Sequence, residues 1–300
     1  MAGSDTAVRA VGLPRRTLLR RSSAALHRRP WLRLGGLLSA PLLWLGVAYI
    51  GSLAALLVTA FWSTDTFTGD VVRVWTLDNF AQLWQEDVYR TVVLRTLGVA
   101  VLVTVLDALL AFPIAFYMAK VATPRTQKLL VVAVLMPLWA SYLVKAYAWR
   151  IMVSDSGVIE SVLGVTPGFG LVAATLTLAY LWLPFMILPL FAGLQRLPDS
   201  LLDASEDLGA RPGRTFRSVV LPSVLPALAA GSIFTFSLSL GDYITVEIVG
   251  GTSQLLGNVV YDNIGAANNL PFAAAMATVT VAVMVCYLAA VRRTGALDNL

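Results

Sequence analysis

Residues 199–222 read D-S-L-L-D-A-S-E-D-L-G-A-R-P-G-R-T-F-R-S-V-V-L-P, a polar stretch inside a very apolar chain. It carries four acids and three arginines and lies between the fourth and fifth of six apolar segments. Asp199 or Ser200 can accept hydrogen bonds from the free amides of a helix start. Gly209 can take the left-handed conformation that ends a helix, and Pro212 suits the first turn of the next one. The stretch therefore predicts a helix–glycine–helix element that a membrane protein presents to a soluble partner.

The composition of the chain places it in a lipid bilayer. Of its 300 residues, 58% are hydrophobic and 13% are charged, and the mean hydropathy is +0.76. A soluble domain cannot bury that much apolar surface, whereas a membrane-spanning helix needs about 20 mostly apolar residues. Six segments meet this need: 38–62, 93–119, 128–150, 169–194, 218–246 and 272–291. We expect an all-α polytopic protein with six transmembrane helices in one domain, 34–293, between a basic tail at 1–33 and a C-terminal tail at 294–300.

Positive charge predicts the orientation of the chain. Most of the 22 Lys and Arg lie in the N-terminal tail, in the loop at 120–128, around the polar stretch and after the last segment. Such residues concentrate on the cytoplasmic side of membrane proteins. Both termini and residues 195–217 are therefore expected in the cytoplasm, and the acidic loop at 63–92 outside. The net charge of +5 reflects this topology, and we do not interpret it as a sign of nucleic-acid binding.

The basic tail allows two interpretations. P-R-R-T-L-L-R at 14–20 is similar to a twin-arginine export signal. A cleaved signal has an apolar region of only about 7–15 residues, whereas the apolar stretch that follows here is long enough to span a bilayer. We favour a cytoplasmic tail, poorly ordered up to about Arg29, followed by a permanent first helix.

Several chemistries find no support in the sequence. Cys286 and His27 are the only cysteine and the only histidine, so neither a metal site nor a Ser-His-Asp triad is indicated. No G-x-x-x-x-G-K-[ST] motif occurs, so we do not expect this chain to bind ATP phosphates itself. We predict no catalytic residues and no cofactor in this chain.

An amphipathic connector on the membrane surface is the plainest alternative for residues 199–222. The helix that begins this stretch would then turn its acids towards anionic lipid head groups, and the repulsion disfavours that arrangement. Its other face is apolar or small: Leu201, Leu202, Ala204, Ser205 and Leu208. Small side chains let another protein surface approach closely, and Phe216 can anchor in a pocket of that surface.

The order Asp203-Ala204-Ser205, Gly209 and Leu221-Pro222 resembles the E-A-A…G…I-x-L-P motif of ABC importer permeases. Asp203 stands where the motif has glutamate and Ser205 where it has the second alanine, so the carboxylate and the small size are kept. In that family the motif forms cytoplasmic coupling helices, which dock on the ATP-hydrolysing subunit. The resemblance implies a set of ATPase-docking residues: Asp203, Ala204, Ser205, Gly209 and Phe216.

Longer stretches look like the spermidine/putrescine-type permeases: M-P-L-W-A-S-Y-L-V-K-A-Y-A-W at 136–149, L-P-F-M-I-L-P-L at 183–190, S-L-G-D-Y-I-T-V-E-I-V-G-G at 239–251 and L-L-G-N-V-V at 255–260. The similarity covers residues 35–293 and implies the type I ABC importer permease fold in a bacterial cytoplasmic membrane. It also implies import of polyamines or a related small solute. The implied partners are an ATPase dimer that binds ATP-Mg, a second permease subunit in a heterodimer, and an extracytoplasmic solute-binding protein.

Acidic residues at membrane depth are candidates for a translocation path. Asp107 lies near the middle of the second segment, where a charge costs about 2.5–3.5 kcal/mol and should face a protein interior or a wet cavity. It would attract a cation or, alternatively, make a helix–helix hydrogen bond or pair with Lys145. Asp242 and Tyr243 follow Gly241, which permits a broken helix that lines a cavity. They fall on the S-L-G-D-Y part of the resemblance, which implies a role in the pathway or its gate. The alternative for Asp242 is a cap at the end of the span.

Aromatic side chains can bind an organic cation through their π faces. Six lie in or near the third and fourth segments: Trp139, Tyr142, Tyr147, Trp149, Tyr180 and Trp182. We favour Trp139, Tyr147 and Trp182 as path residues. The alternative is an interfacial belt of Trp and Tyr, which is common at the ends of membrane spans.

A self-contained secondary carrier or channel for a small cationic solute is the second class of function. Asp107 and Asp242 would then serve as ion-coupling groups. Such a carrier needs no ATPase-docking element, and the two halves of the chain show no clear repeat of the kind that many carriers have. The polar stretch therefore favours an importer permease.

Overall fold

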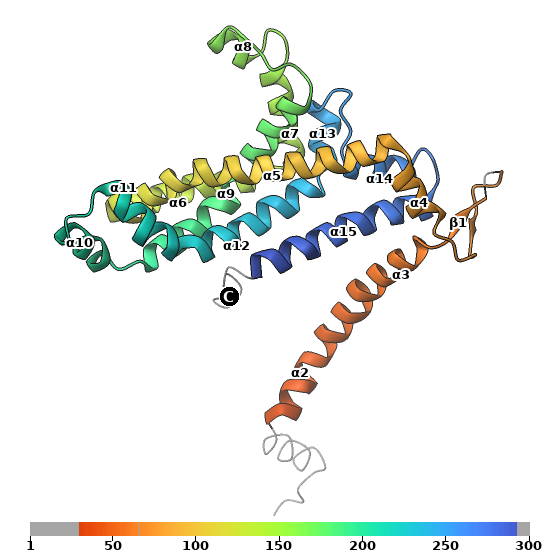
Figure 1. Ribbon diagram of the computed structural model, residues 1–300, viewed down its shortest axis with the longest axis horizontal. Helices are drawn as coiled ribbons and strands as arrows, with labels where there is room; N and C mark the ends of the chain where they lie inside the picture. The colour runs from red at the N-terminus through yellow and green to blue at the C-terminus, as the bar shows by residue number, and fades with distance from the viewer. Residues whose placement is uncertain (1–29, 66, 293–300) are drawn as a thin grey trace, which may run out of the picture. The chain divides into compact units, whose positions relative to one another are not determined.

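The computed structural model describes residues 30–65 and 67–292 (Figure 1). It divides into two units, before and after the bond between Leu56 and Leu57, and each is described by itself. Five helices in the described ranges are long and apolar enough to cross a membrane, and a sharply bent pair makes a sixth candidate. The predicted all-α polytopic architecture is confirmed. The stretch at 14–20 and His27 lie outside the described residues.

The first unit is part of one long apolar helix. α2 (Pro30–Trp44), the π-helical turn η1 (Leu45–Ile50) and α3 (Gly51–Thr59) follow one another without a break, and α3 continues into the second unit. The stretch Leu34–Thr59 has a mean hydropathy of 2.0. Its large apolar side chains are mostly exposed, Trp44 by 72%. Such a surface is suited to contact with lipid.

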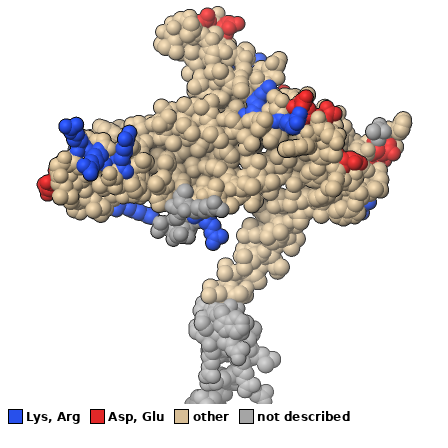
Figure 2. Space-filling model, in the orientation of Figure 1, with Lys and Arg blue, Asp and Glu red and all other residues tan. Residues whose placement is uncertain are grey.

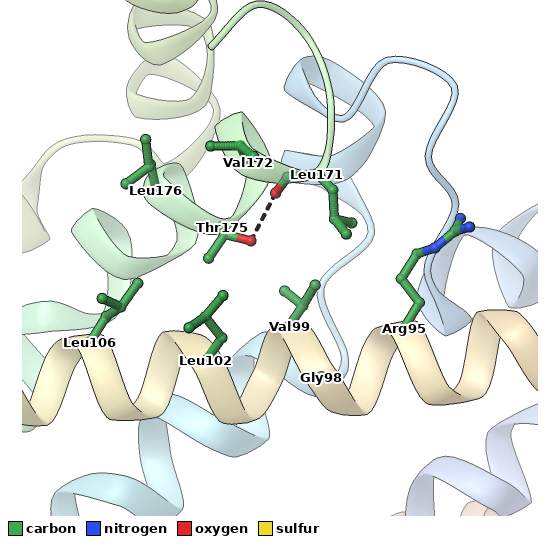
Figure 3. Close-up of a pocket in the computed structure, with 9 residues that line it drawn as sticks. All are labelled: Arg95, Gly98, Val99, Leu102, Leu106, Leu171, Val172, Thr175 and Leu176. Atoms are coloured by element: carbon green, nitrogen blue, oxygen red, sulfur yellow. Dashed lines mark hydrogen bonds between the residues drawn. The ribbon is translucent and has the colours of Figure 1, made fainter.

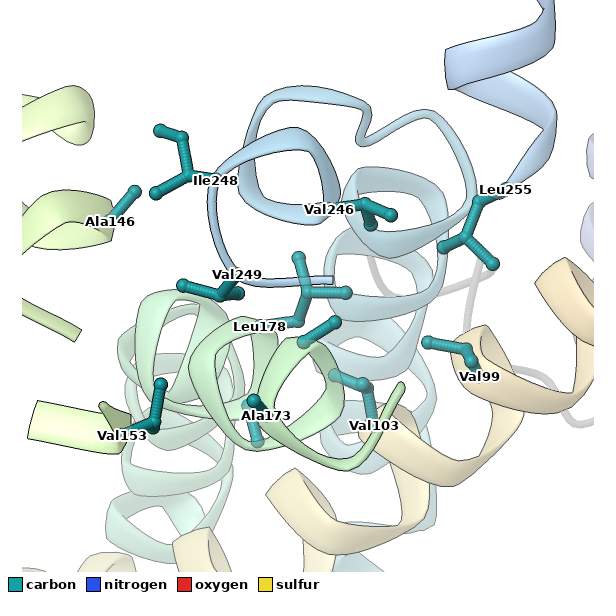
Figure 4. Packing of buried hydrophobic residues seen from close by; sticks show 12 residues of the cluster. Val99, Val103, Ala146, Val153, Ala173, Leu178, Val246, Ile248, Val249 and Leu255 are labelled. Atoms are coloured by element: carbon teal, nitrogen blue, oxygen red, sulfur yellow. The ribbon is translucent and has the colours of Figure 1, made fainter. Parts of the chain in front are cut away.

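Three long helices form the core of the second unit. α5 (Asp87–Phe116), α9 (Leu171–Arg196) and α12 (Leu221–Leu240) pack against one another, and α15 (Leu270–Arg292) packs beside α12. Buried side chains from α5, α9 and the short helix α13 (Ile244–Val249) interleave, among them Val103, Leu178 and Val249 (Figure 4).

Small residues bring α9 and α12 close together. A Cβ added to Gly193 would lie 2.4 Å from the Cβ of Ala227, and one added to Gly231 would lie 2.7 Å from the sulfur of Met186. Side chains of this size are typical of tight contacts between membrane helices. The two helices therefore touch along their backbones as well as through their side chains.

The third apolar segment is not one straight span. α6 (Pro124–Trp139) and α7 (Tyr142–Val153) meet at 93°. The prediction of one helix over 128–150 is therefore wrong, because Ala140 and Ser141 adopt extended backbone with ψ of 142° and 138°. α7 leads to the short helix α8 (Val158–Leu163), which lies away from α5 and α9 (Figure 1).

The fifth apolar segment is broken where glycine allows it. α12 ends at Leu240 and α13 begins at Ile244, so the span predicted for 218–246 is interrupted near its end. Gly241 closes α12 through a hydrogen bond from its amide to the carbonyl of Ser237, 3.3 Å away. At its start the candidate span is longer than predicted, since helical structure runs on from Pro212 to Leu240.

The two ends of the second unit carry different short elements (Figure 1). One end holds the antiparallel pair β1 (Ser63–Thr64) and β2 (Val71–Val72), with α4 (Asp78–Gln85), α13 and α14 (Leu256–Ile264). The other end holds η2 (Tyr117–Val121), α10 (Asp199–Asp207), α11 (Pro212–Thr215) and η3 (Phe216–Val220). The helix–glycine–helix element predicted for 199–222 is therefore present, between the end of α9 and the start of α12.

Charge also differs between these two ends. In Figure 2, one group of Lys and Arg lies at the end that carries α10 and α11, and a second lies beside acids nearer the opposite end. Most of the visible Asp and Glu lie near that opposite end and on α8. The asymmetry that predicts the orientation in the sequence is thus also present on the folded surface.

Candidate functional site

The start of α10 is fixed by a lysine from another part of the chain. Lys120 in η2 donates to the carbonyl of Leu197 at 2.5 Å and to Oδ1 of Asp199 at 2.7 Å. The Lys120 side chain is only 9% exposed, although that of Asp199 is 80% exposed. Pro198 is the N-cap of α10, and no side chain caps the helix. The prediction that Asp199 or Ser200 caps α10 is therefore wrong, because the carboxylate of Asp199 pairs with Lys120.

Gly209 ends α10 as predicted. Its φ of +73° lies in the left-handed region, which only glycine adopts readily. The amides of Gly209 and Ala210 turn back to the carbonyls of Glu206 and Ser205, at 2.8 and 3.0 Å. Pro212 then occupies the first turn of α11, also as predicted. The chain thus reverses between α10 and α11 through a short, hydrogen-bonded turn.

A polar contact joins the two short helices. The hydroxyls of Ser205 in α10 and Thr215 in α11 are 2.8 Å apart, and Thr215 is buried. Phe216 packs edge-on against Phe112 of α5, with 5.0 Å between ring centroids, and keeps 37% of its surface exposed. Ser205 therefore holds α10 to α11, and Phe216 holds the segment to α5, besides any contact they make with a partner.

The outward surface of α10 combines acidic, small and apolar groups. Asp203 and Ala204 are exposed, and Leu208 is 88% exposed. Sequence reasoning placed Leu208 on the apolar face of the helix but did not single it out. Because so large an apolar side chain is costly to leave in water, Leu208 is an additional candidate for contact with a partner.

Asp107 is enclosed by the helices around it. It is 0% exposed and belongs to a buried stripe of α5 that includes Val103 and Ala111. Among the described residues neither of its carboxyl oxygens has a hydrogen-bond partner. No ion pair joins it to Lys145 within the described ranges, so the predicted alternative of a pair with Lys145 is wrong. The carboxyl group therefore lies in the protein interior, as expected from the free energy that a charged side chain costs when it faces lipid.

Asp242 is the centre of a second set of contacts, which we call the Asp242 cluster: Asp242, Tyr142, Thr245 and Trp182. Asp242 is 7% exposed and accepts a hydrogen bond from the backbone amide of Thr245 at 2.9 Å. The Tyr142 hydroxyl donates to the Asp242 carboxylate and lies 2.5 Å from Oγ1 of Thr245. Asp242 thus binds the first turn of α13 and also ties α13 to α7.

An aromatic ring extends the Asp242 cluster to α9. Tyr142 stacks on Trp182 with 5.9 Å between centroids and 21° between ring planes. Trp182 also contacts Phe185, and its buried indole nitrogen has no partner among the described residues. Tyr142 was one of the six aromatic candidates but not one of the favoured three. Its link to Asp242, a hundred positions away, gives no signal in the sequence.

The remaining path candidates lie outside this cluster. Tyr243 stacks on Tyr261 at 4.9 Å and borders a cavity of about 430 Å³ with Gly241 and Gly257. Trp139 and Tyr147 are 83% and 54% exposed. Of the six predicted path residues, contacts therefore connect two, Asp242 and Trp182, through Tyr142. No group of His, Cys, Asp and Glu in the described ranges could hold a metal ion.

Comparison with known proteins places this geometry in a family. The chain is 45% identical to the inner membrane ABC transporter permease protein YdcU of Escherichia coli K12, over 96% of this chain and 97% of that one. It is 30% identical to the spermidine/putrescine transport system permease protein PotB of Haemophilus influenzae, over 70% and 77% of the two chains.

The fold agrees with these relatives. A chain of a bacterial alginate ABC transporter, crystallised with an alginate-bound periplasmic protein, superposes with a TM-score of 0.66 at 15% identity, over 88% of this chain and 93% of that one. Residues 100–298 match the family of binding-protein-dependent transport system inner membrane components. These relatives are transport components rather than enzymes, and the chain belongs to that family of ABC importer permeases.

Proposed function

We propose that this chain is the permease subunit through which an ATP-driven importer passes polyamines or a related small solute, and that a separate ATPase drives it through residues 199–222. The names of the PotB relatives support the polyamine class. ATP-Mg would be bound by the ATPase dimer. The other partners would be a second, non-identical permease subunit and an extracytoplasmic solute-binding protein.

The observation that carries the coupling role is the way in which α10 is held. Lys120 joins its start to η2, which directly follows α5, and Ser205 joins its middle to α11. A partner that pushes on Asp203, Ala204 or Leu208 therefore moves α5, α9 and α12 with the segment. An unattached surface loop would absorb such a push by bending.

The orientation follows from the same assignment. If the polar segment docks on an ATPase, it faces the cytoplasm, and the β1–β2 hairpin faces outward. The charge asymmetry between the two ends agrees with this orientation. We propose that both termini lie in the cytoplasm of a bacterial cell, with the chain spanning its inner membrane several times.

The Asp242 cluster is the part of the molecule best suited to an organic cation. A carboxylate next to stacked aromatic rings offers both an ionic partner and π faces to an ammonium group. Tyr142 comes from α7, Trp182 from α9 and Asp242 from the break between α12 and α13. A solute that reaches the cluster would contact all three and couple their positions.

The first test separates docking from folding. Gly209→Leu should abolish solute uptake because leucine is strained at a φ of +73°, and Asp203→Lys should do so by reversing an exposed charge. Membrane insertion should be unchanged in both. Gly213→Ala is the matched control, because Gly213 lies in α11 with no positive φ and no atom within 4 Å of an added Cβ.

The measurement is uptake by a preparation containing all partner chains, together with the amount of ATPase that copurifies. A panel of putrescine, spermidine and neutral or acidic solutes identifies the cargo class. Unchanged uptake and unchanged ATPase copurification in both variants would show that residues 199–222 are not the coupling segment.

A further inference from the structure

A groove runs along the surface of the second unit between α5 and α9, on the half of these helices that lies nearer α13. It has a volume of about 390 Å³. Figure 3 shows its wall, which is built from one face of each helix. The lining residues from α5 are Arg95, Gly98, Val99, Leu102 and Leu106, and those from α9 are Leu171, Val172, Thr175 and Leu176. We call it the α5–α9 groove.

The wall of the α5–α9 groove suits hydrocarbon. Leu102, Val172 and Leu176 are 49%, 62% and 40% exposed. The hydroxyl of Thr175 already donates to the carbonyl of Leu171 at 2.8 Å, so it is paired within its own helix (Figure 3). A hydrated solute that entered would lose water contacts without replacing them. The transported solute is therefore a poor occupant.

Arg95 is the exception to this apolar lining. Its guanidinium donates to the carbonyl of Gln254 at 3.4 Å, which is a long hydrogen bond. Within residues 30–65 and 67–292 it makes no ion pair. A guanidinium has five N–H donors in a fork that fits phosphate oxygens. Most of the donor capacity of Arg95 is thus left for an anion at this end of the groove.

The spacing of the groove matches one leaflet of a bilayer. Arg95 and Leu106 lie at its two ends (Figure 3). Leu106 follows Arg95 by eleven helical positions, which at 1.5 Å per position is about 16.5 Å. Half of the hydrocarbon core of a bilayer is about 15 Å. When Arg95 is at the level of the lipid head groups, Leu106 is near the midplane.

We propose that the α5–α9 groove binds an acidic phospholipid, whose phosphate contacts Arg95 and one of whose acyl chains lies along Leu102 and Leu106. The charge of Arg95 selects an anion and repels a polyammonium solute. The site is therefore separate from any translocation path for cations. It depends on the chain spanning a bilayer and does not depend on which solute is carried or on the coupling segment.

The test measures lipid retained by the purified importer complex. Phosphatidylglycerol and phosphatidylcholine with identical acyl chains are the two probes, and native mass spectrometry counts the bound molecules. The wild-type chain should retain phosphatidylglycerol about tenfold better, the effect of one charge-assisted contact. Arg95→Gln should lower its retention to the phosphatidylcholine level, and Arg95→Lys should restore part of it.

Two further variants separate charge from shape. Arg90→Gln is the matched charge control, because Arg90 is an exposed arginine of α5 outside the groove that pairs with Asp87. Gly98→Leu should exclude both lipids, since the space around Gly98 is open and leucine fills the groove without a clash. Gly46→Leu, at an equally open glycine of the first helix, should exclude neither.

Three results would overturn the proposal. The first is equal retention of the two lipids by the wild type. The second is full retention of phosphatidylglycerol by a correctly assembled Arg95→Gln variant. The third is a cross-link from a Gly98→Cys variant, made in a cysteine-free background, to the second permease subunit, which would show that a protein helix covers the groove.

Discussion

Lys120 fixes the start of α10 through two hydrogen bonds. It bridges positions 77 and 79 residues further along the chain, at Leu197 and Asp199. In the sequence it counts only as one positive charge in a loop predicted to be cytoplasmic. The polar segment and its glycine stop could be predicted, because turn chemistry is local. The attachment of the segment to α5 could not, because it joins distant residues.

Replacing Lys120 tests this attachment. Lys120→Met should lower ATP-dependent uptake about tenfold, since a hydrogen bond to a charged group contributes about 1.5–3 kcal/mol and Asp199 is partly screened by water. Lys120→Arg should restore much of the loss, and Lys128→Met, at an exposed residue of α6, should have little effect. Uptake and ATPase activity that stay coupled in Lys120→Met would show that the bridge does not transmit motion.

Tyr142 is the residue that sequence reasoning undervalued. Tyr142→Phe keeps the stacking on Trp182 but removes the hydroxyl that donates to Asp242. We expect the loss of a buried, charge-assisted hydrogen bond to cost roughly 1–3 kcal/mol of stability. The variant should also weaken stimulation of ATP hydrolysis by a cationic solute.

Thermal unfolding and solute-stimulated ATPase activity of the complex check this expectation. Tyr49→Phe is the control, because Tyr49 is 71% exposed on η1 and is not a path candidate. If Tyr142→Phe unfolds at the wild-type temperature and responds normally to the solute, the Asp242 cluster contributes neither to folding nor to the path.

At the scale of elements, breaks in the membrane helices could be predicted only where the sequence has a residue that commonly interrupts helices. Gly241 indicated the break between α12 and α13. The bend between α6 and α7 falls on Ala140 and Ser141, neither of which is a typical helix breaker. Hydropathy therefore counted a single span where the structure has two helices at 93°.

The contact between α9 and α12 is another element-scale feature with a direct test. Gly193→Ala should destabilise the permease by roughly 1–3 kcal/mol, as overpacking does, because the new Cβ would lie 2.4 Å from that of Ala227. Combining it with Ala227→Gly should recover most of the loss. Gly98→Ala, in open space on α5, should be neutral. Equal thermal midpoints for Gly193→Ala and the wild type would mean that the two helices separate easily.

At the scale of the whole molecule, the orientation of the chain across the membrane is predicted only from the distribution of positive charge. Two exposed residues at opposite ends of the second unit test it: Leu208, 88% exposed, and Phe67, 98% exposed. With Cys286 replaced by serine, Leu208→Cys should react with an impermeant maleimide only in inverted membrane vesicles. Phe67→Cys should react only in cells with a permeable outer barrier and an intact inner membrane. The reverse pattern would place residues 199–222 outside the cytoplasm and refute ATPase docking.

The tight seam between α9 and α12 has a mechanical consequence. Gly193 and Gly231 bring the two helices into direct contact. We therefore expect α9 and α12 to rotate together as one rigid pair. The polar segment leaves the end of one and enters the start of the other. Both ends of the segment are thus attached to the same helix pair. A force on the segment therefore rotates α9 and α12 together and does not separate them.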